Sequence, residues 1–143
     1  MSPFRYPAIV KVDTAGFYLV TFPDVPEAGT DANTREEVLR EAVDALSAAL
    51  GGYVSARRPI PKPSKARPGQ MMLTLPTLVT AKLALYEAMR KAGLSNSELG
   101  RRLGISEGAV RRLLDLDHRS HIGQVETALE VLGHRLVVDV QTA

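Results

Sequence analysis

The spacing of apolar residues changes near residue 77, and this change constrains the fold more than any other feature of the chain. Before it, short runs of aromatic and β-branched residues lie between turn signals, a pattern that predicts strands. After it, apolar residues recur every three or four positions, a pattern that predicts helices. A chain of 143 residues can form two very small modules, and we predict one at 1–76 and the other at 77–143.

The first module is predicted to be a small antiparallel sheet with one covering helix. Residues 4–12 and 17–22 are strand-forming runs on either side of an Asp-Thr-Ala-Gly tetrad, which indicates a hairpin. We expect a short strand near 28–32 and another at 71–75, after an extended connector at 55–70 that is rich in proline and basic residues. This order of elements describes an α+β layer.

The covering helix is predicted to begin at a Thr-x-x-Glu capping box formed by Thr34 and Glu37. In such a box the hydroxyl and the carboxylate each accept a backbone N–H of the first turn. The residues that follow at helical spacing form one apolar stripe able to cover a sheet: Val38, Leu39, Ala42, Leu46, Ala49, Leu50 and Tyr53.

Charge divides the chain in a similar way. Residues 1–55 carry four basic and eight acidic side chains, and residues 56–143 carry fourteen and eight, so the parts have net charges of −4 and +6. The basic part suits a polyanion and the acidic part a cationic partner. Uneven surface charge without functional meaning is the alternative.

The absence of cysteine excludes disulfides, thiolate nucleophiles and cysteine-ligated zinc. It suits a reducing compartment, so we expect a cytoplasmic protein. The N-terminus has no cationic region followed by a long apolar stretch, and no window approaches the roughly 18 consecutive apolar residues of a spanning helix. We therefore expect neither export nor membrane insertion.

Residues 95–115 have the pattern of a helix-turn-helix. Gly100 is small where two helices cross, Gly104 can take the positive φ that ends a helix, and Ser106 can cap the second helix. The residues expected to face inward are apolar: Leu99, Leu103, Ile105, Val110, Leu113 and Leu114. From about Thr80 to Leu132 the chain is similar to the helix-turn-helix of phage-repressor-like regulators.

With that face buried, the outward face of the second helix can enter a major groove, where arginine reads guanine or neutralises phosphate. The predicted DNA contacts are Ser106, Glu107, Gly108, Arg111 and Arg112, with Arg119 and Ser120 of the following loop as phosphate contacts. A helical hairpin with no DNA function is the alternative. His118 and His121 are expected to be polar loop residues, because a metal site with Glu126 would lack a further strong ligand.

The chain closes with an apolar, β-prone run at 136–140, which we expect to form a short strand. Since a lone strand leaves its edge unpaired, the simplest partner is the same strand of a second chain. Leu136, Val138 and Val140 are therefore predicted dimerisation residues. A homodimer is expected, and a tetramer through the N-terminal modules is the alternative.

The first module closely resembles the antitoxins of the HicB family. The resemblance rests on Tyr6-Pro7, the Gly-Phe-Tyr after the turn, Phe22-Pro23-Asp24-Val25-Pro26, Thr30-Asp31 and Ile60-Pro61-x-Pro63. It departs from the usual Gly-Cys after Pro26, where Glu27-Ala28 stands. The resemblance implies a partial ribonuclease-H-like fold without nuclease activity or cofactor. The implied partner is a HicA-type messenger-RNA-cleaving toxin, and the second module would repress the shared operon at its operator DNA.

Six carboxylates of the first module could meet such a cationic toxin: Asp24, Glu27, Asp31, Glu37, Glu41 and Asp44. A solvated helix face is the alternative for each of them. The rival function is a nuclease or hydrolase tethered to DNA, with Asp13 or Asp24 in its centre. Against it, a ribonuclease-H centre needs clustered carboxylates, one of them in the first strand, and residues 6–12 contain none.

Overall fold

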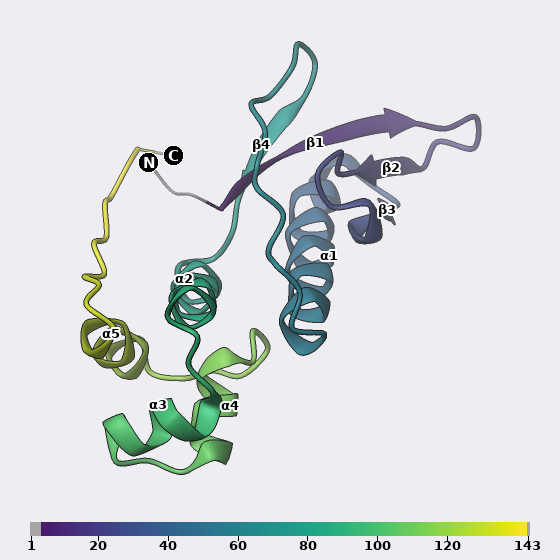
Figure 1. The fold of residues 1–143 in the computed structure, drawn as a ribbon. Helices are drawn as coiled ribbons and strands as arrows, with labels where there is room; N and C mark the ends of the chain where they lie inside the picture. The colour runs from purple at the N-terminus through teal and green to yellow at the C-terminus, as the bar shows by residue number, and fades with distance from the viewer. Residues whose placement is uncertain (1–3, 143) are drawn as a thin grey trace. The chain divides into compact units, whose positions relative to one another are not determined.

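The structure, a computed structural model, describes residues 4–142. These residues form one four-stranded sheet, five α-helices and a short 3-10 helix (Figure 1). The predicted α+β class is therefore confirmed. The chain divides into two compact units, with the division between Thr80 and Ala81.

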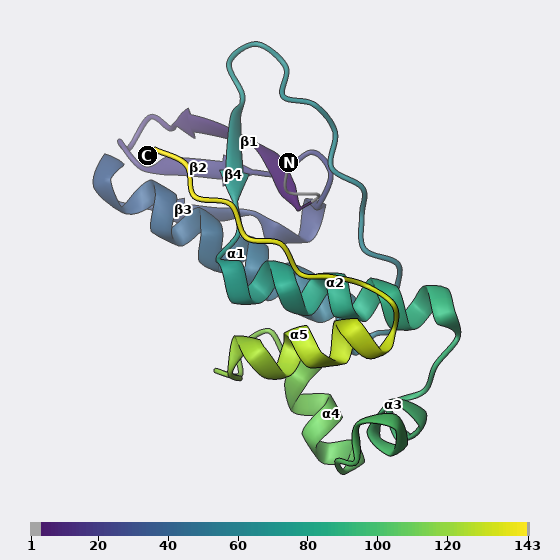
Figure 2. The ribbon, with the colours of Figure 1, turned by 90° about the vertical axis from the view of Figure 1, so that its left-hand side faces the viewer.

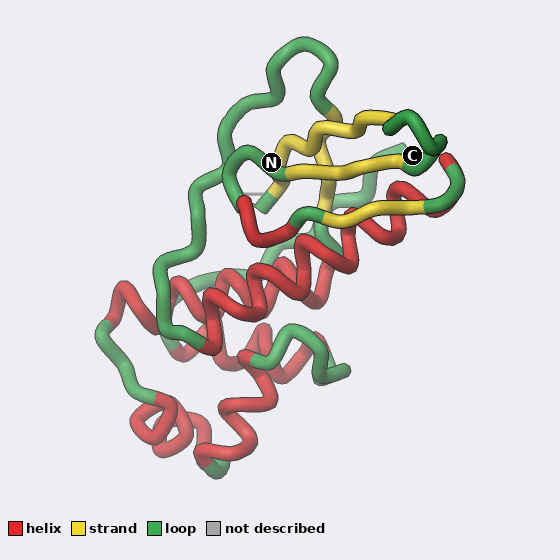
Figure 3. Tube along the Cα trace, turned by 90° about the vertical axis from the view of Figure 1, so that its right-hand side faces the viewer, coloured by secondary structure: helices red, strands yellow, loops and turns green. Residues whose placement is uncertain are grey.

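The sheet of the first unit, whose strands are yellow in Figure 3, is antiparallel and has the strand order β3-β2-β1-β4. β1 (Arg5–Val12) and β2 (Tyr18–Thr21) form the predicted hairpin, and β3 (Thr30–Ala32) follows the 3-10 helix η1 (Pro26–Ala28). β4 (Met71–Thr74) pairs with the first half of β1, as expected for a strand that rejoins the sheet.

Local hydrogen bonds determine the turn of the hairpin. The Oδ1 atom of Asp13 accepts the backbone N–H groups of Ala15 and Phe17, each at 2.9 Å. Gly16 has φ of +88°, a conformation that favours glycine. The Asp13 carboxylate thus closes the turn, which explains why this short loop joins two strands.

The helix α1 (Arg35–Ser55) lies against one face of the sheet (Figure 3). Val38, Ala42, Leu46 and Leu50 are buried, since a spacing of four residues keeps them on nearly one line along the helix. The sequence pattern places Leu39 on this stripe too, but its side chain is 58% exposed. The prediction for Leu39 is wrong because a step of one residue turns it about 100° away from Val38.

The start of α1 also differs from the prediction. Thr34 is the N-cap residue, but its side chain makes no capping hydrogen bond. The backbone carbonyl of Thr34 accepts the N–H of Glu37 at 3.2 Å, and the Glu37 carboxylate accepts the N–H of Asn33 at 3.3 Å. The backbone therefore takes the role predicted for the hydroxyl, and the reciprocal capping box is not formed.

The connector after α1 is attached to the sheet rather than free. The fully buried Tyr6 of β1 donates its hydroxyl hydrogen to the carbonyl of Pro61 at 2.7 Å, and Ile60 is buried next to it in sequence. These contacts lead the chain back to the edge of β1, where β4 forms.

The second unit is helical (Figure 2). α2 (Thr77–Ala92) begins just before the division, and α3 (Asn96–Leu103), α4 (Glu107–Leu114) and α5 (Ile122–Val131) follow. Its core is built mainly from aliphatic side chains: Leu83, Leu85, Leu99, Val110, Leu113, Val125 and Leu129.

The predicted C-terminal strand is absent from the described chain. Residues 134–142 have no regular secondary structure and leave α5 as an irregular segment (Figure 2). A strand needs a hydrogen-bonded neighbour, and the described residues of the second unit contain no strand for the tail to pair with.

Candidate functional site

The turn between α3 and α4 depends on two glycines. Gly104 ends α3 in the left-handed conformation with φ of +70°, as predicted. A Cβ atom on Gly100 would lie 2.7 Å from the carbonyl oxygen of Ile105, closer than a side-chain carbon can approach. The backbone of the turn can therefore lie this close to α3 only because position 100 carries no side chain.

Both helices of this motif begin at a serine cap. The Oγ of Ser106 accepts the N–H of Ala109 at 3.1 Å, which confirms the predicted start of α4. At α3, the Oγ of Ser95 accepts the N–H of Glu98 and donates to its carboxylate, both at 3.1 Å. Each cap satisfies a backbone donor that the first helical turn leaves unpaired.

The outward face of α4 carries two arginines. Arg111 and Arg112 are exposed, and their guanidinium nitrogens lie 3.7 and 3.8 Å from where a Cβ of Gly108 would be. Two positive charges thus converge on a helix surface with no intervening side chain. Glu107 and Ser106 are also exposed, whereas Gly108 is partly covered.

The loop after α4 presents its two predicted phosphate contacts differently. Arg119 is exposed. Ser120 is partly buried, and its hydroxyl lies 3.3 Å from the Arg112 carbonyl, to which it donates, and 3.0 Å from Nδ1 of His118. The structure therefore engages the Ser120 hydroxyl in contacts with the end of α4 and with its own loop.

Lys82 of α2 is a residue of this site that the sequence reasoning missed. Its side chain has no exposed surface, and its ammonium group donates to backbone carbonyls at the end of α4 and in the loop. Burial lowers the pKa of the Lys82 ammonium, and the nearby Asp115 carboxylate acts in the opposite direction. The available signal was a single lysine within the apolar run Ala-Lys-Leu-Ala-Leu of a helix.

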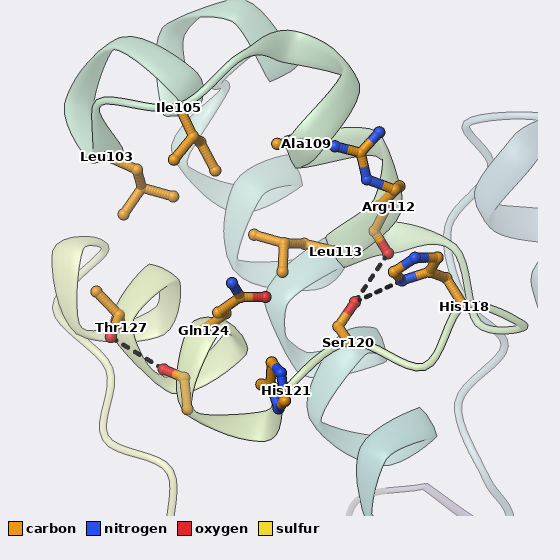
Figure 4. Close-up of a pocket in the computed structure, with 11 residues that line it drawn as sticks. Leu103, Ile105, Ala109, Arg112, Leu113, His118, Ser120, His121, Gln124 and Thr127 are labelled. Carbon is orange, nitrogen blue, oxygen red and sulfur yellow. Dashed lines mark hydrogen bonds between the residues drawn. The ribbon is translucent and has the colours of Figure 1, made fainter.

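A groove of about 510 Å³ lies beside α4 (Figure 4). Leu103, Ile105 and Leu113 line it, and Arg112 lies at its edge. The sequence pattern predicts that Ile105 fills the turn, but its side chain is 38% exposed. That prediction is wrong because the backbone of Ile105, rather than its side chain, occupies the space next to Gly100.

Two of the predicted toxin contacts are engaged within the first unit. Asp24 Oδ2 accepts the backbone N–H of Ser64 at 2.8 Å and its hydroxyl at 3.0 Å, so it fastens the connector. Glu27 accepts the Tyr53 hydroxyl at 2.8 Å and lies 3.5 Å from Arg58, whose guanidinium stacks over the Tyr53 ring at 4.2 Å.

These contacts shift the ionisation of both partners. The hydrogen bond from Tyr53 lowers the pKa of the Glu27 carboxyl below its ordinary value, and Arg58 adds to the effect. The same hydrogen bond raises the pKa of the Tyr53 hydroxyl. The Glu27 carboxylate is thus held in its charged form. Glu27 is also the first residue at which this sequence departs from the Gly-Cys that usually follows Pro26 in the HicB pattern.

The other four predicted toxin contacts lie on β3 and α1. Asp31 and Asp44 are exposed, while Glu37 and Glu41 are partly exposed. Glu41 lies 3.7 Å from Arg40, an exposed pair of the kind that contributes little stability. All four carboxylates retain surface through which a partner can reach them.

The predicted dimerisation residues lie in the irregular tail. Val138 is 61% exposed and Val140 is 90% exposed, while Leu136 is partly buried. The tail therefore presents apolar surface that the described chain does not cover.

The carboxylates that a nuclease centre would need have other tasks in the structure. Asp13 closes the hairpin turn and Asp24 holds Ser64. Among residues 4–142, no three or more His, Asp or Glu side chains are grouped so that they could hold a metal ion. No helix in the described part of the chain is long and apolar enough to span a membrane.

Comparison with known proteins identifies relatives of both units. Residues 5–84 match a family model described as a HicB-like antitoxin of a bacterial toxin–antitoxin system. Residues 80–115 match one described as a winged helix-turn-helix DNA-binding domain.

Curated relatives match over nearly the whole chain. The chain is 39% identical to the protein named Antitoxin HicB 2 of Photorhabdus laumondii, over 92% of this chain and 93% of that protein. It is 37% identical to Antitoxin HicB of Pseudomonas fluorescens, over 98% and 96%. It is 33% identical to Antitoxin HicB of Escherichia coli, over 92% and 96%.

Proposed function

The chain belongs to the HicB-like family of bacterial antitoxins, and from this premise we propose that it is both a toxin inhibitor and a repressor. The first unit binds and occludes a HicA-type messenger-RNA-cleaving ribonuclease. The second unit binds the operator of the operon that encodes both proteins. The observation that carries the proposal is that the relatives named antitoxins align across both units.

For the toxin, the support is the acidic surface of the first unit. The exposed Asp31 and Asp44 and the partly exposed Glu41 keep carboxylates that can attract a cationic nuclease and accelerate its capture. Asp24 and Glu27 contribute indirectly, because they fasten the loop before β3 to the connector and to α1. We propose inhibition by occlusion, without catalysis by this chain.

Rescue of growth tests the toxin proposal. Cells that express the toxin from the neighbouring reading frame should survive when they also express residues 1–76, and that fragment should not bind DNA. A variant with Asp31→Asn, Glu41→Gln and Asp44→Asn should associate with the toxin more slowly at low salt. Failure of a folded fragment to rescue would contradict the assignment of neutralisation to the first unit.

For DNA, the support is the exposed pair Arg111 and Arg112 on a helix that Ser106 caps and that follows the close turn at Gly100. We propose that α4 enters the major groove and that Arg119 contacts the backbone. A gel-shift titration with the duplex upstream of the operon tests this. Equal affinity for that duplex and for a scrambled one would contradict a role as a specific repressor.

We further propose that the chain acts in the cytoplasm as a homodimer. The exposed Val138 and Val140 can pair with the same tail of a second chain as a two-stranded ribbon, in which each tail gains a hydrogen-bonded neighbour and covers apolar surface. A two-fold axis through such a ribbon would present two recognition helices to a palindromic operator. Light scattering distinguishes this dimer from a tetramer that also pairs through the first units.

A further inference from the structure

Lys82 is the one charged side chain buried among the residues that the structure describes. Its Nζ lies 2.6 Å from the carbonyl oxygen of Asp115, 2.7 Å from that of His118 and 2.9 Å from that of Arg112. The Oγ of Ser120 is a fourth acceptor at 3.0 Å. Since an ammonium has three hydrogens, the carbonyls take the short bonds and Ser120 shares one.

These acceptors belong to one small region, namely the end of α4 and the loop that follows. The last carbonyls of a helix have no partner within it and carry partial negative charge. The Arg112 carbonyl lies in that last turn, and Asp115 is the residue after the helix. A buried cation at this point satisfies the carbonyls and interacts favourably with the helix dipole.

The loop carbonyl of His118 ties the same ammonium to the segment that carries Arg119. Ser120 strengthens the tie, because its hydroxyl also donates to the Arg112 carbonyl at 3.3 Å. The Nζ atom of Lys82 thus joins α2 to the end of α4, the proposed recognition helix, and to the loop between α4 and α5 that carries Arg119, here called the phosphate loop.

We propose that Lys82 is a positioning residue for DNA binding. It cannot touch DNA, because its side chain has no exposed surface. It acts by holding the loop that carries Arg119 at a fixed distance from the arginines of α4, so that base and phosphate contacts form together. This inference rests on the proposed binding of operator DNA.

The test compares Lys82→Met with Lys91→Met, a matched control that removes an exposed lysine from the last turn of the same helix. Methionine is an unbranched side chain that lacks only the terminal group of lysine in length, and it offers no donor to the three carbonyls. With the duplex upstream of the operon, Lys82→Met should bind about tenfold more weakly or worse, as for removal of one well-placed interaction. Lys91→Met should bind no more than a few times more weakly.

The salt dependence separates positioning from a general reduction of stability. If Lys82 holds the phosphate loop, the slope of log affinity against log salt should fall by about 0.9 for each phosphate that the variant no longer neutralises. The effect of Lys82→Met should also shrink in an Arg119→Ala background, because the interaction it supports is already missing. Circular dichroism and thermal melting confirm that the proteins compared are folded.

The outcomes are distinct. If the wild type binds no DNA, the proposed function fails. If it binds and a folded Lys82→Met binds equally, with the same salt slope, the positioning role is overturned. Should Lys82→Met not fold, the operator affinity and salt slope of Lys82→Gln are compared with those of the wild type, since its amide keeps two N–H donors. Unfolding of both variants would show a role in the whole unit and would also overturn the proposal.

Discussion

Arg111 and Arg112 give the first expectation at the scale of single residues. Each substitution to Ala should weaken operator binding by about 1–3 kcal/mol if the side chain reads a base. The reason is that both guanidinium groups lie on the exposed surface of α4, next to a glycine that leaves them room. Fluorescence anisotropy at fixed salt measures the effect.

Arg67→Ala is the matched control, because Arg67 is an exposed arginine of the connector in the first unit. It should leave operator affinity unchanged, and all three variants should still neutralise the toxin. Wild-type operator affinity in the Arg111→Ala, Arg112→Ala double variant would remove α4 from the groove.

Glu27 and Tyr53 give an expectation about pH. The pKa of Glu27 is lowered in the folded protein, so its contribution to stability is full above the ordinary value of 4.5 and disappears as the pH falls through the folded pKa. Tyr53→Phe removes the hydrogen bond that is the main cause. The variant should be less stable than wild type near neutral pH, and the difference should narrow in acid.

Denaturant titrations from neutral pH down to about 3 measure this narrowing. Carboxyl chemical shifts provide the second readout, since the pKa of Glu27 should move towards its ordinary value in Tyr53→Phe. A gap between the two proteins that stays constant with pH would show that the hydrogen bond does not depend on the ionised carboxylate.

At the scale of elements, the angle between α3 and α4 gives a prediction about two glycines. Gly100→Ala should lower the free energy of unfolding of the second unit by about 1–3 kcal/mol, because the added methyl group overlaps the Ile105 carbonyl. Gly108→Ala is the matched control on the partner helix. Its methyl group would meet only side-chain atoms at 3.7 Å or more, and alanine favours a helix by up to about 1 kcal/mol.

Thermal unfolding followed by circular dichroism measures both variants. A Gly100→Ala protein as stable as wild type would mean that the two helices can separate without cost. Operator affinity should fall with Gly100→Ala even where the protein remains folded, because the added methyl group displaces the turn that positions α4 for the proposed DNA contact.

Elements with strong local signals could be predicted from sequence. The β1–β2 hairpin, α1 and the helix-turn-helix all follow from turn residues, caps and periodic apolar positions within about twenty residues of one another. Details that depend on which of several neighbouring groups makes a contact could not be predicted from sequence. The backbone carbonyl of Thr34 takes the place of its hydroxyl at the start of α1, so the predicted side-chain cap does not form. Leu39 is exposed, so the buried stripe of α1 is narrower than the pattern of apolar residues in the sequence.

Contacts between residues far apart in the chain could also not be predicted from the sequence. The bonds from Lys82 to carbonyls 30 to 36 residues away involve backbone acceptors, which leave no trace in residue identity. The same holds for Asp24, whose partner Ser64 lies 40 residues later. Sequence could identify Asp24 as an acidic surface candidate but not as the group that fastens the connector.

At the scale of the whole molecule, the tail gives a prediction about assembly. Val138→Pro removes a backbone donor from the centre of the expected ribbon, so the variant should not form the proposed dimer. Operator affinity should then fall by about a hundredfold or more, since two linked recognition helices bind far more tightly than one. Toxin affinity should be unaffected.

Light scattering and gel-shift titration measure the two properties on the same samples. Thr142→Pro, beyond the apolar part of the tail, is the matched control and should remain dimeric. A Val138→Pro protein that is still dimeric and binds its operator normally would show that the chains associate through another surface.

Gly108 has a consequence for how proteins with the proposed repressor function diverge. It lies in the middle of the proposed reading surface, yet a side chain there would meet only side-chain atoms, among them the flexible ends of two arginines. The framework of the motif depends on Gly100 and Gly104, so position 108 is free to vary without disturbing it. A cell that carries several related operons needs each repressor to ignore the operators of the others. If α4 reads the operator as proposed, a substitution at position 108 changes which operator is preferred while the protein keeps the same fold.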